Sequence, residues 1–114
     1  MQLIERKKRT VGLELTTSNQ DIYTVPSRFT TNITSILISN KSGSSVTFTL
    51  DRYDLATTTF HTFAGVVSLA ANSILQIREN QLYLVGGDKI RGLASANSAV
   101  NVTVSLEEFF QTSL

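Results

Sequence analysis

The feature that most constrains the fold is a strict alternation of apolar and polar residues near the C-terminus. In AVNVTVSLEEF (residues 99–109) every second residue from Val100 to Leu106 is apolar, and VTFTL (residues 46–50) repeats the pattern. Successive side chains of a β-strand point to opposite faces of its sheet, so this period indicates strands with one buried face. The residues expected to meet in the core are Val46, Phe48, Leu50, Val102, Val104 and Leu106.

Similar extended runs follow one another along the whole chain. They are predicted at residues 11–17, 20–26, 30–39, 46–50, 57–65, 73–79, 81–87, 88–94 and 99–109. Turn residues separate them roughly every ten residues, and no segment of that length has a convincing helical stripe of period 3.6. This spacing is typical of a β-sandwich. We therefore predict an all-β chain, with a single antiparallel, jelly-roll-like sandwich of about eight strands.

Composition supports one globular domain. The chain has 114 residues, of which 41% are hydrophobic and 17% charged, as suits a protein with a real core. It contains no cysteine, which excludes a disulfide framework and a Cys-based metal site. The start lacks the apolar stretch of a signal peptide, and no apolar run is long enough for a membrane helix. We therefore expect no membrane association, and we interpret the three Asn-x-Ser/Thr sequons, at Asn32, Asn40 and Asn101, as chance occurrences.

Charge divides the sequence into two parts. Residues 6–9 (RKKR) hold four of the ten basic residues, whereas the chain beyond them has six basic and eight acidic residues. We predict an extended basic N-terminal arm over residues 1–10 and a sandwich domain over 11–114. Like charges in a row repel one another, so the isolated arm is expected to be disordered.

The arm has four possible interpretations. It could lie on the acidic surface of a neighbouring protein, contact nucleic-acid phosphates, act as a nuclear signal, or be a frayed solvated end. No aromatic residues interleave with the basic ones, so a stacking platform for nucleic acid is not supported.

The glycine- and serine-containing loop NKSGSS (residues 40–45) could either hold an anion or turn the chain. A phosphate-binding loop of this kind precedes a helix, but here a strand follows. We therefore predict the turn of a β-hairpin, with a positive φ at Gly43 and side-chain-to-backbone hydrogen bonds from Asn40 and the serines.

Residues capable of catalysis are few and scattered. His61 is the single histidine, and one histidine is too few for a His-based zinc site. Consecutive Glu107 and Glu108 point to opposite faces of a strand and so cannot act together as an acid–base pair. We predict no catalytic residue and no cofactor, and the chain is not expected to be an enzyme.

Aspartates at turns offer two further candidate sites. Asp51 and Asp54 could share a calcium ion, but a solvated turn is the preferred interpretation. Asp88 follows two glycines and could be a ligand, although capping the turn explains it better. No metal site is predicted.

The assembled pattern resembles a known group of proteins. The stretch IYTVPSRFTTNITSILISNKSGSSVTFTLDRYD (residues 22–54) resembles the opening of small β-sandwich proteins of tailed-phage virions, and YLVGGDKIRGLASANSAVNVTVSLEEF (residues 83–109) resembles their second half. The matching positions are 23–26, 36–40, 87–88, 90 and 102–107. The resemblance implies a non-enzymatic virion structural protein, foremost a capsid decoration or cement protein. A tail- or fibre-associated module, which could bind a receptor or carbohydrate, is the alternative.

The resemblance also implies the partners. These would be other virion proteins, either the major capsid protein or tail components, in a homo-oligomer with a trimer favoured; nucleic acid is not expected to bind. Phe109 and Phe110 could serve this interface or could simply close one end of the sandwich. The absence of Trp argues against the carbohydrate alternative. The candidate interface residues are Leu3, Ile4, Arg6, Lys7, Lys8, Arg9, Phe109 and Phe110.

Overall fold

The computed structural model describes residues 2–78 and 82–113, with side chains for 6–78 and 82–110. Its regular structure over these residues is entirely β. The strands are β1 (Gln2–Glu14), β2 (Gln20–Thr24), β3 (Phe29–Asn40), β4 (Val46–Asp54), β5 (Thr59–Leu69), β6 (Ile74–Ile77), β7 (Leu82–Val85), β8 (Lys89–Ala94) and β9 (Val100–Ser113). Each overlaps a predicted run. The main differences are that β9 extends further toward the C-terminus and that β1 begins at Gln2, within the predicted arm, and shares only residues 11–14 with its run.

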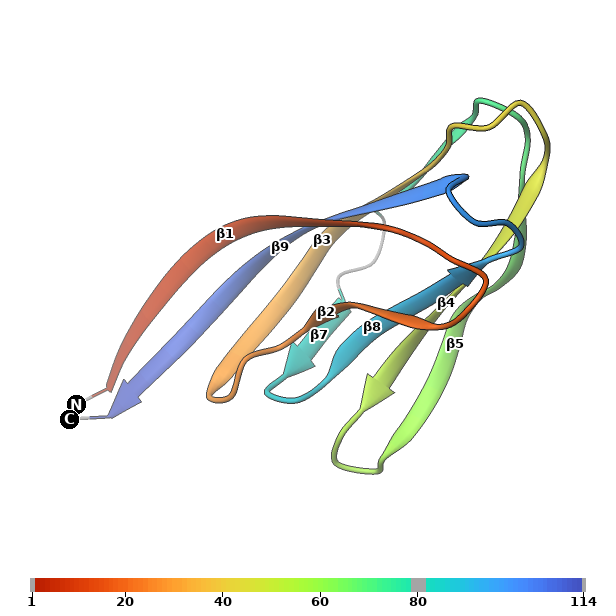
Figure 1. Cartoon of the computed structure of the whole chain (residues 1–114). Coiled ribbons are helices and arrows are strands. Elements are labelled where there is room, and N and C mark those ends of the chain that lie inside the picture. The colour runs from red at the N-terminus through yellow and green to blue at the C-terminus, as the bar shows by residue number, and fades with distance from the viewer. Residues whose placement is uncertain (1, 79–81, 114) are drawn as a thin grey trace.

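The strands form two antiparallel sheets that pack face to face (Figure 1). Sheet A has the order β1-β9-β3-β6, and β7 also pairs with β3; sheet B has the order β2-β8-β4-β5. The predicted antiparallel sandwich is confirmed. First and last strands lie side by side in sheet A, although they are far apart in the sequence.

The core lies between the sheets and contains the residues that the alternation predicted. Val102 and Val104 of β9 are 0% exposed, as are Phe48 and Leu50 of β4. Val46 and Leu106 are nearly as buried. The residues between them, such as Thr103, face outward and are partly exposed. The alternation therefore places the apolar residues of β4 and β9, one strand from each sheet, in a common core.

The basic segment at the N-terminus differs from its prediction. It is not a separate disordered arm: Gln2–Thr10 are the first part of β1 and pair with β9 over their whole length, from Gln2↔Ser113 to Thr10↔Ser105. The strand continues without a break through residue 10, where the domain boundary was expected. Cross-strand carboxylates offset part of the repulsion among the cations, because Arg9 bonds to Glu108 and Lys8 lies opposite Glu107.

The β1–β9 pair also gives the molecule its elongated shape, 55 × 26 × 22 Å. The first residue of β3, Phe29, pairs with Phe110, whereas the β1–β9 register runs on to Ser113. The ends of β1 and β9 therefore extend past the rest of sheet A as a two-stranded ribbon (Figure 1).

The loop over residues 40–45 is not a hairpin turn. β3 belongs to sheet A and β4 to sheet B, so the loop crosses from one sheet to the other. Asn40 is 2% exposed; its amide donates to the carbonyls of Ser44 (2.8 Å) and Ala70 (3.0 Å) and accepts from the Ser42 amide (2.9 Å). These bonds confirm the predicted role of the Asn40 side chain. The prediction for Gly43 is wrong, since Gly87 is the glycine with a positive φ, at 91°.

The assignment of faces on β9 can be tested with a matched pair of substitutions. Val104→Asp buries an unpaired charge, which costs several kcal/mol, whereas Thr103→Asp leaves its charge at the surface. We expect Val104→Asp to unfold the domain at 25 °C and Thr103→Asp to remain folded, as measured by circular dichroism and urea denaturation. Equal stability of the two variants would contradict this assignment.

Candidate functional site

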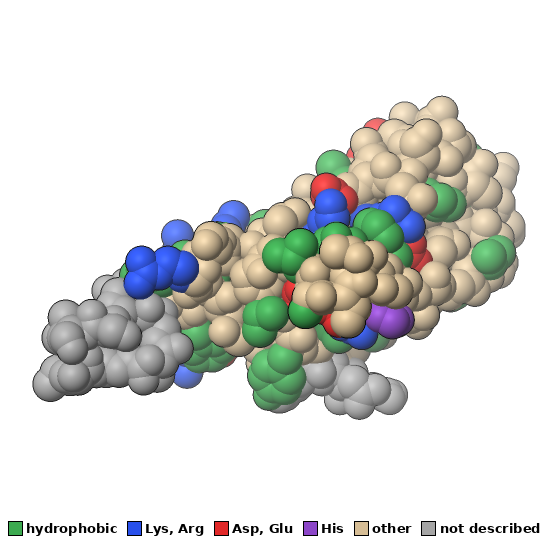
Figure 2. All heavy atoms as spheres, turned by 90° about the horizontal axis from the view of Figure 1, so that it is seen from below, with side chains coloured by type: hydrophobic (Ala, Val, Ile, Leu, Met, Phe, Trp, Pro, Cys, Tyr) green, Lys and Arg blue, Asp and Glu red, His purple; other side chains and the backbone are tan. Residues whose placement is uncertain are grey.

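The predicted interface residues come together at the end of sheet A where the β1–β9 ribbon projects. The register sets Arg6 opposite Phe109, Lys8 opposite Glu107 and Arg9 opposite Leu106. Leu3 and Ile4 pair through their backbones with Thr112 and Gln111, but their side chains lie outside the described residues. Lys and Arg side chains gather along this end of the molecule next to the undescribed atoms (Figure 2). We call Arg6, Lys7, Lys8, Arg9, Phe109 and Phe110 the terminal patch.

Alternation along the strand divides the four cations between two faces. Arg9 lies beside inward-facing Leu106, and Lys7 shares its face, whereas Arg6 and Lys8 lie on the outer face of sheet A. This end of sheet A therefore carries two of the cations on each face, with Glu108 on the inner face and Glu107 on the outer one.

A buried polar network anchors the inner face. The Glu108 carboxylate, 3% exposed, accepts hydrogen bonds from the Tyr23 hydroxyl (2.6 Å) and from Arg9 Nη1 (3.1 Å). Thr31, 0% exposed, lies 2.8 Å from the same hydroxyl. Since Tyr23 gives its single proton to Glu108, the Thr31 hydroxyl donates to Tyr23. The network joins β1, β9 and β3 of sheet A to β2 of sheet B.

Burial raises the pKa of Tyr23 to about 12, and the hydrogen bond to the Glu108 carboxylate adds to the effect. Both causes act in the same direction, because a phenolate would be poorly solvated there and would meet a second negative charge. The folded protein therefore holds this phenol neutral.

The outer face of the ribbon is more open. The Lys8 side chain is 77% exposed, and its ammonium lies 4.0 Å from a Glu107 carboxylate oxygen, a distance at which an exposed ion pair contributes little. Beside it is an open hollow of about 460 Å³ over β1, β9 and β3, lined by residues that include Lys8, Thr34, Leu106 and Glu107. Arg6 and Lys7 are exposed, and among the described side chains neither has a carboxylate partner.

The two phenylalanines have different surroundings. Phe110 stacks on Phe29 with ring centroids 5.0 Å apart, and the Arg28 guanidinium lies 5.8 Å from its ring. Phe109 lies on the opposite, outer face beside Arg6. Both side chains are half-buried. Phe110 thus fits both interpretations, since it packs at the end of the sandwich and still presents part of its surface.

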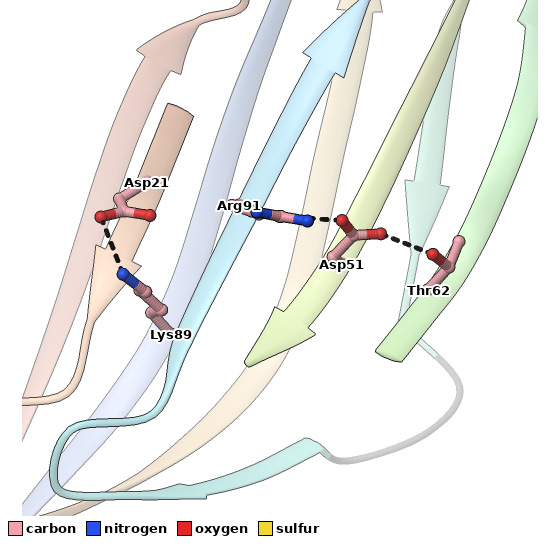
Figure 3. Close-up of polar contacts among 5 residues, drawn as sticks. All are labelled: Asp21, Asp51, Thr62, Lys89 and Arg91. Atoms are coloured by element: carbon pink, nitrogen blue, oxygen red, sulfur yellow. Dashed lines mark hydrogen bonds and ion pairs between the residues drawn. The ribbon is translucent and has the colours of Figure 1, made fainter. Parts of the chain in front are cut away.

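A second polar cluster covers the outer face of sheet B (Figure 3). Asp51 accepts from Arg91 Nε at 2.9 Å and from the Thr62 hydroxyl at 2.7 Å, and Lys89 pairs with Asp21 at 3.3 Å. The prediction of a solvated turn is wrong for Asp51, because the turn between β4 and β5 begins only after residue 54. Asp51 lies within β4, is 6% exposed and pairs with an arginine.

Aromatic rings adjoin this second cluster. Phe60 and Tyr53 lie with centroids 4.6 Å apart; the Arg91 guanidinium is 3.3 Å from the Phe60 ring centroid, and the Lys89 ammonium is 5.2 Å from that of Tyr53. The two cations therefore occupy ring faces on which a sugar would stack. The arrangement stabilises the sheet surface and does not favour carbohydrate binding at this place.

The remaining candidate residues have structural surroundings. Asp88 caps its turn as predicted: its carboxylate accepts from the amides of Val85 and Leu55, both at 3.0 Å. His61 is exposed on β5. Among residues 2–78 and 82–113 no three His, Asp or Glu side chains cluster as metal ligands would. No helix able to span a membrane occurs in the same part of the chain.

Sequence reasoning missed the Tyr23–Glu108–Arg9 network. The signal available was Glu108 itself, which follows inward-facing Val102, Val104 and Leu106 at the same period. A carboxylate at such a position needs a partner, because an unpaired buried charge is very costly. Its partners are 85 and 99 residues away in the chain, so the sequence could not name them.

Comparisons with known proteins support the fold. No protein-family model matches the chain, and no curated protein matches its sequence. Its structure is similar to a subunit of the Bacillus endospore appendages, which form disulfide-linked pili (TM-score 0.59, 14% identity, 99% of this chain and 92% of that one). It is also similar to a chain in the capsid structure of Helicobacter pylori bacteriophage KHP30 (TM-score 0.56, 7% identity, 100% of this chain and 100% of that one). A third similar chain is from the virus-like particle of Macrobrachium rosenbergii extra small virus (TM-score 0.51, 14% identity, 97% of this chain and 81% of that one).

These similarities agree with the resemblance to small β-sandwich virion proteins. At such low identities they establish a shared fold. The disulfide linkage of the spore appendages has no counterpart here, because this chain has no cysteine.

The integration of β1 into the sandwich can be tested by deletion. Removing residues 1–9 takes away Arg9 and leaves the Glu108 carboxylate buried without its cation, a loss of about 3–5 kcal/mol. We expect the melting temperature to fall by about 10 °C or more, and Arg9→Gln in the full chain should reproduce part of that fall. An unchanged melting temperature after deletion would instead support the predicted arm, which is separate from the fold.

The Tyr23 hydroxyl gives a prediction about alkaline pH. The folded-state pKa of about 12 lies above the ordinary value of 10.0, so the neutral phenol stabilises the fold fully below pH 10, and this contribution is lost as the pH rises through 12. Tyr23→Phe should lose about 1–3 kcal/mol at pH 7 through the missing hydrogen bond and show a smaller decline in stability between pH 10 and 12. Tyr53→Phe, on the outer face of sheet B, is the control and should follow the wild-type pH profile.

Proposed function

We propose that the chain is a non-enzymatic structural protein of a tailed-phage particle, foremost a capsid decoration or cement protein. The observation that carries this proposal is the terminal patch: exposed cations and half-buried phenylalanines gathered at one end of sheet A. Arginine and aromatic residues are enriched among the side chains that dominate protein interfaces. The similarity in fold to a bacteriophage capsid protein supports the same proposal.

The way the chain uses its polar residues also fits a structural role. Asp51, Asp88 and Glu108 are buried, and each accepts two hydrogen bonds from within the fold. Tyr23 is held neutral within the same set of contacts. These acidic groups and this phenol thus stabilise the fold, and the exposed terminal patch is left for binding.

The proposal extends to assembly and location. The partners would be other virion proteins, the major capsid protein in the first place, and the chain would act as a homo-oligomer, with a trimer favoured. A tail- or fibre-associated module is the alternative. Gold-labelled antibodies against the chain, viewed on intact particles by electron microscopy, would distinguish a place on the head from one on the tail. Label on the head supports the decoration protein, label on the tail supports the alternative, and absence from the particle overturns both.

Attachment should depend on the charge of the terminal patch. Arg6→Glu/Lys8→Glu reverses two exposed outer-face charges, so we expect attachment to particles that lack the protein to weaken at least fivefold in co-sedimentation, most clearly at low salt. Arg78→Glu, an exposed cation beyond the end of β6, is the control and should attach normally. Equal binding by all three proteins would exclude the terminal patch from the interface.

A further inference from the structure

β1 is an edge strand with one free side. It pairs with β9 along its 13 residues, and within the described chain no strand pairs with its other side. At 3.4 Å per residue such an edge is roughly 40 Å long. The unpaired N–H and C=O groups of alternate residues form a template on which another extended chain can add.

The charges on this edge argue against a second copy as that chain. Arg6, Lys7, Lys8 and Arg9 are consecutive. An antiparallel β1–β1 pair centred on them would set like charges opposite one another, which is destabilising. Charged side chains of this kind are one of the devices that keep edge strands from pairing with themselves. The edge thus discriminates by charge and favours a strand that carries carboxylates.

Three of the four cations are available to such a strand. Arg9 is engaged by the buried Glu108, whereas Lys8 is 77% exposed and Arg6 and Lys7 have no carboxylate partner among the described side chains. Arg6 and Lys8 lie on the outer face and Lys7 on the inner one. A partner strand would meet these cations with carboxylates at neighbouring positions, on both of its faces.

The C-terminal part of β1 has apolar side chains on its inward face. Val11 and Leu13 are half-buried, face inward and pack against the core. A strand added beside them would bury apolar side chains at every second position on that face. The edge therefore suits a segment with one acidic part and one part that alternates apolar and polar residues.

The number of available cations argues against nucleic acid. Three phosphate contacts would give a salt dependence of roughly −2.7 in log K against log salt, at 0.9 per contact. The steep salt dependence of strong nucleic-acid binding corresponds to about six to ten phosphate contacts. A phosphate oxygen can accept only from the N–H groups of a free strand edge, whereas an extended peptide pairs with both its N–H and its C=O groups.

We propose that the free edge of β1 accepts an extended, acidic segment of a neighbouring particle protein as an additional strand of sheet A. This inference rests on the proposed structural role and names the chemistry of the partner. The strand bonds would supply affinity, and the three cations would select against basic segments and against other copies of β1.

The test uses four probes and the full-length protein. The probes are a ten-residue peptide with an acidic half and an alternating Val/Thr half, the same peptide N-methylated at alternate residues, a peptide with Lys in place of its acidic residues, and a single-stranded oligonucleotide. Fluorescence anisotropy measures binding at 50 and 200 mM salt, and amide hydrogen exchange follows the protection of β1. The variants are Arg6→Glu and, at the other edge of sheet A, Arg78→Glu.

We expect the acidic peptide to bind and to protect β1 amides, with N-methylation weakening it at least tenfold. Arg6→Glu should weaken binding at least fivefold and Arg78→Glu less than twofold. Equal binding of the N-methylated peptide, tighter binding of the oligonucleotide, or no binding of the acidic peptide would each overturn the inference. The particle labelling described above separates the two proposals. If the acidic peptide fails but the chain is found on the particle, only strand addition is lost; if the peptide binds but the chain is absent from the particle, the proposed function is lost.

Discussion

The structure depends on β9, which pairs with β1 on one side and with β3 on the other. This strand supplies a row of buried residues from Val100 to Glu108, so sheet A and half of the core are organised around it. Because β9 is also the last strand, the sheet cannot be completed until both ends of the chain are in place. Pairing over such sequence separations closes large loops and is favourable only when much apolar surface is buried with it.

The Glu108 network shows how the sandwich tolerates a charge at the end of that row. A carboxylate taken out of water is costly, and it is retained here because an arginine and a tyrosine satisfy it together. The same contacts connect β1 of sheet A to β2 of sheet B, which are adjacent in the sequence and lie in opposite layers. The basic segment is thereby part of the fold as well as part of its surface.

The proposed function follows from what the fold leaves unused. Buried acidic groups are committed to internal partners, whereas the cations at the projecting end and the free side of β1 are open to other molecules. Adhesion through an edge strand and a small charged surface needs no reactive group. It requires only that the sandwich hold these features rigidly in position, which the long β1–β9 ladder does.

Alternation and turn spacing along the chain determined a great deal: the all-β succession of short strands, the inward residues of β4 and β9, and the opposite orientation of Glu107 and Glu108. Those properties are local, because they depend only on the two-residue period of a strand and on burial of apolar side chains. Pairing was decided by the tertiary structure alone. It turned residues 40–45 into a crossover between sheets, placed Asp51 beside Arg91, and paired the basic segment with β9. The physical reason is that strand partners and buried ion pairs are chosen among residues far apart in the sequence, by the register that buries the most apolar surface, and no local pattern records that choice.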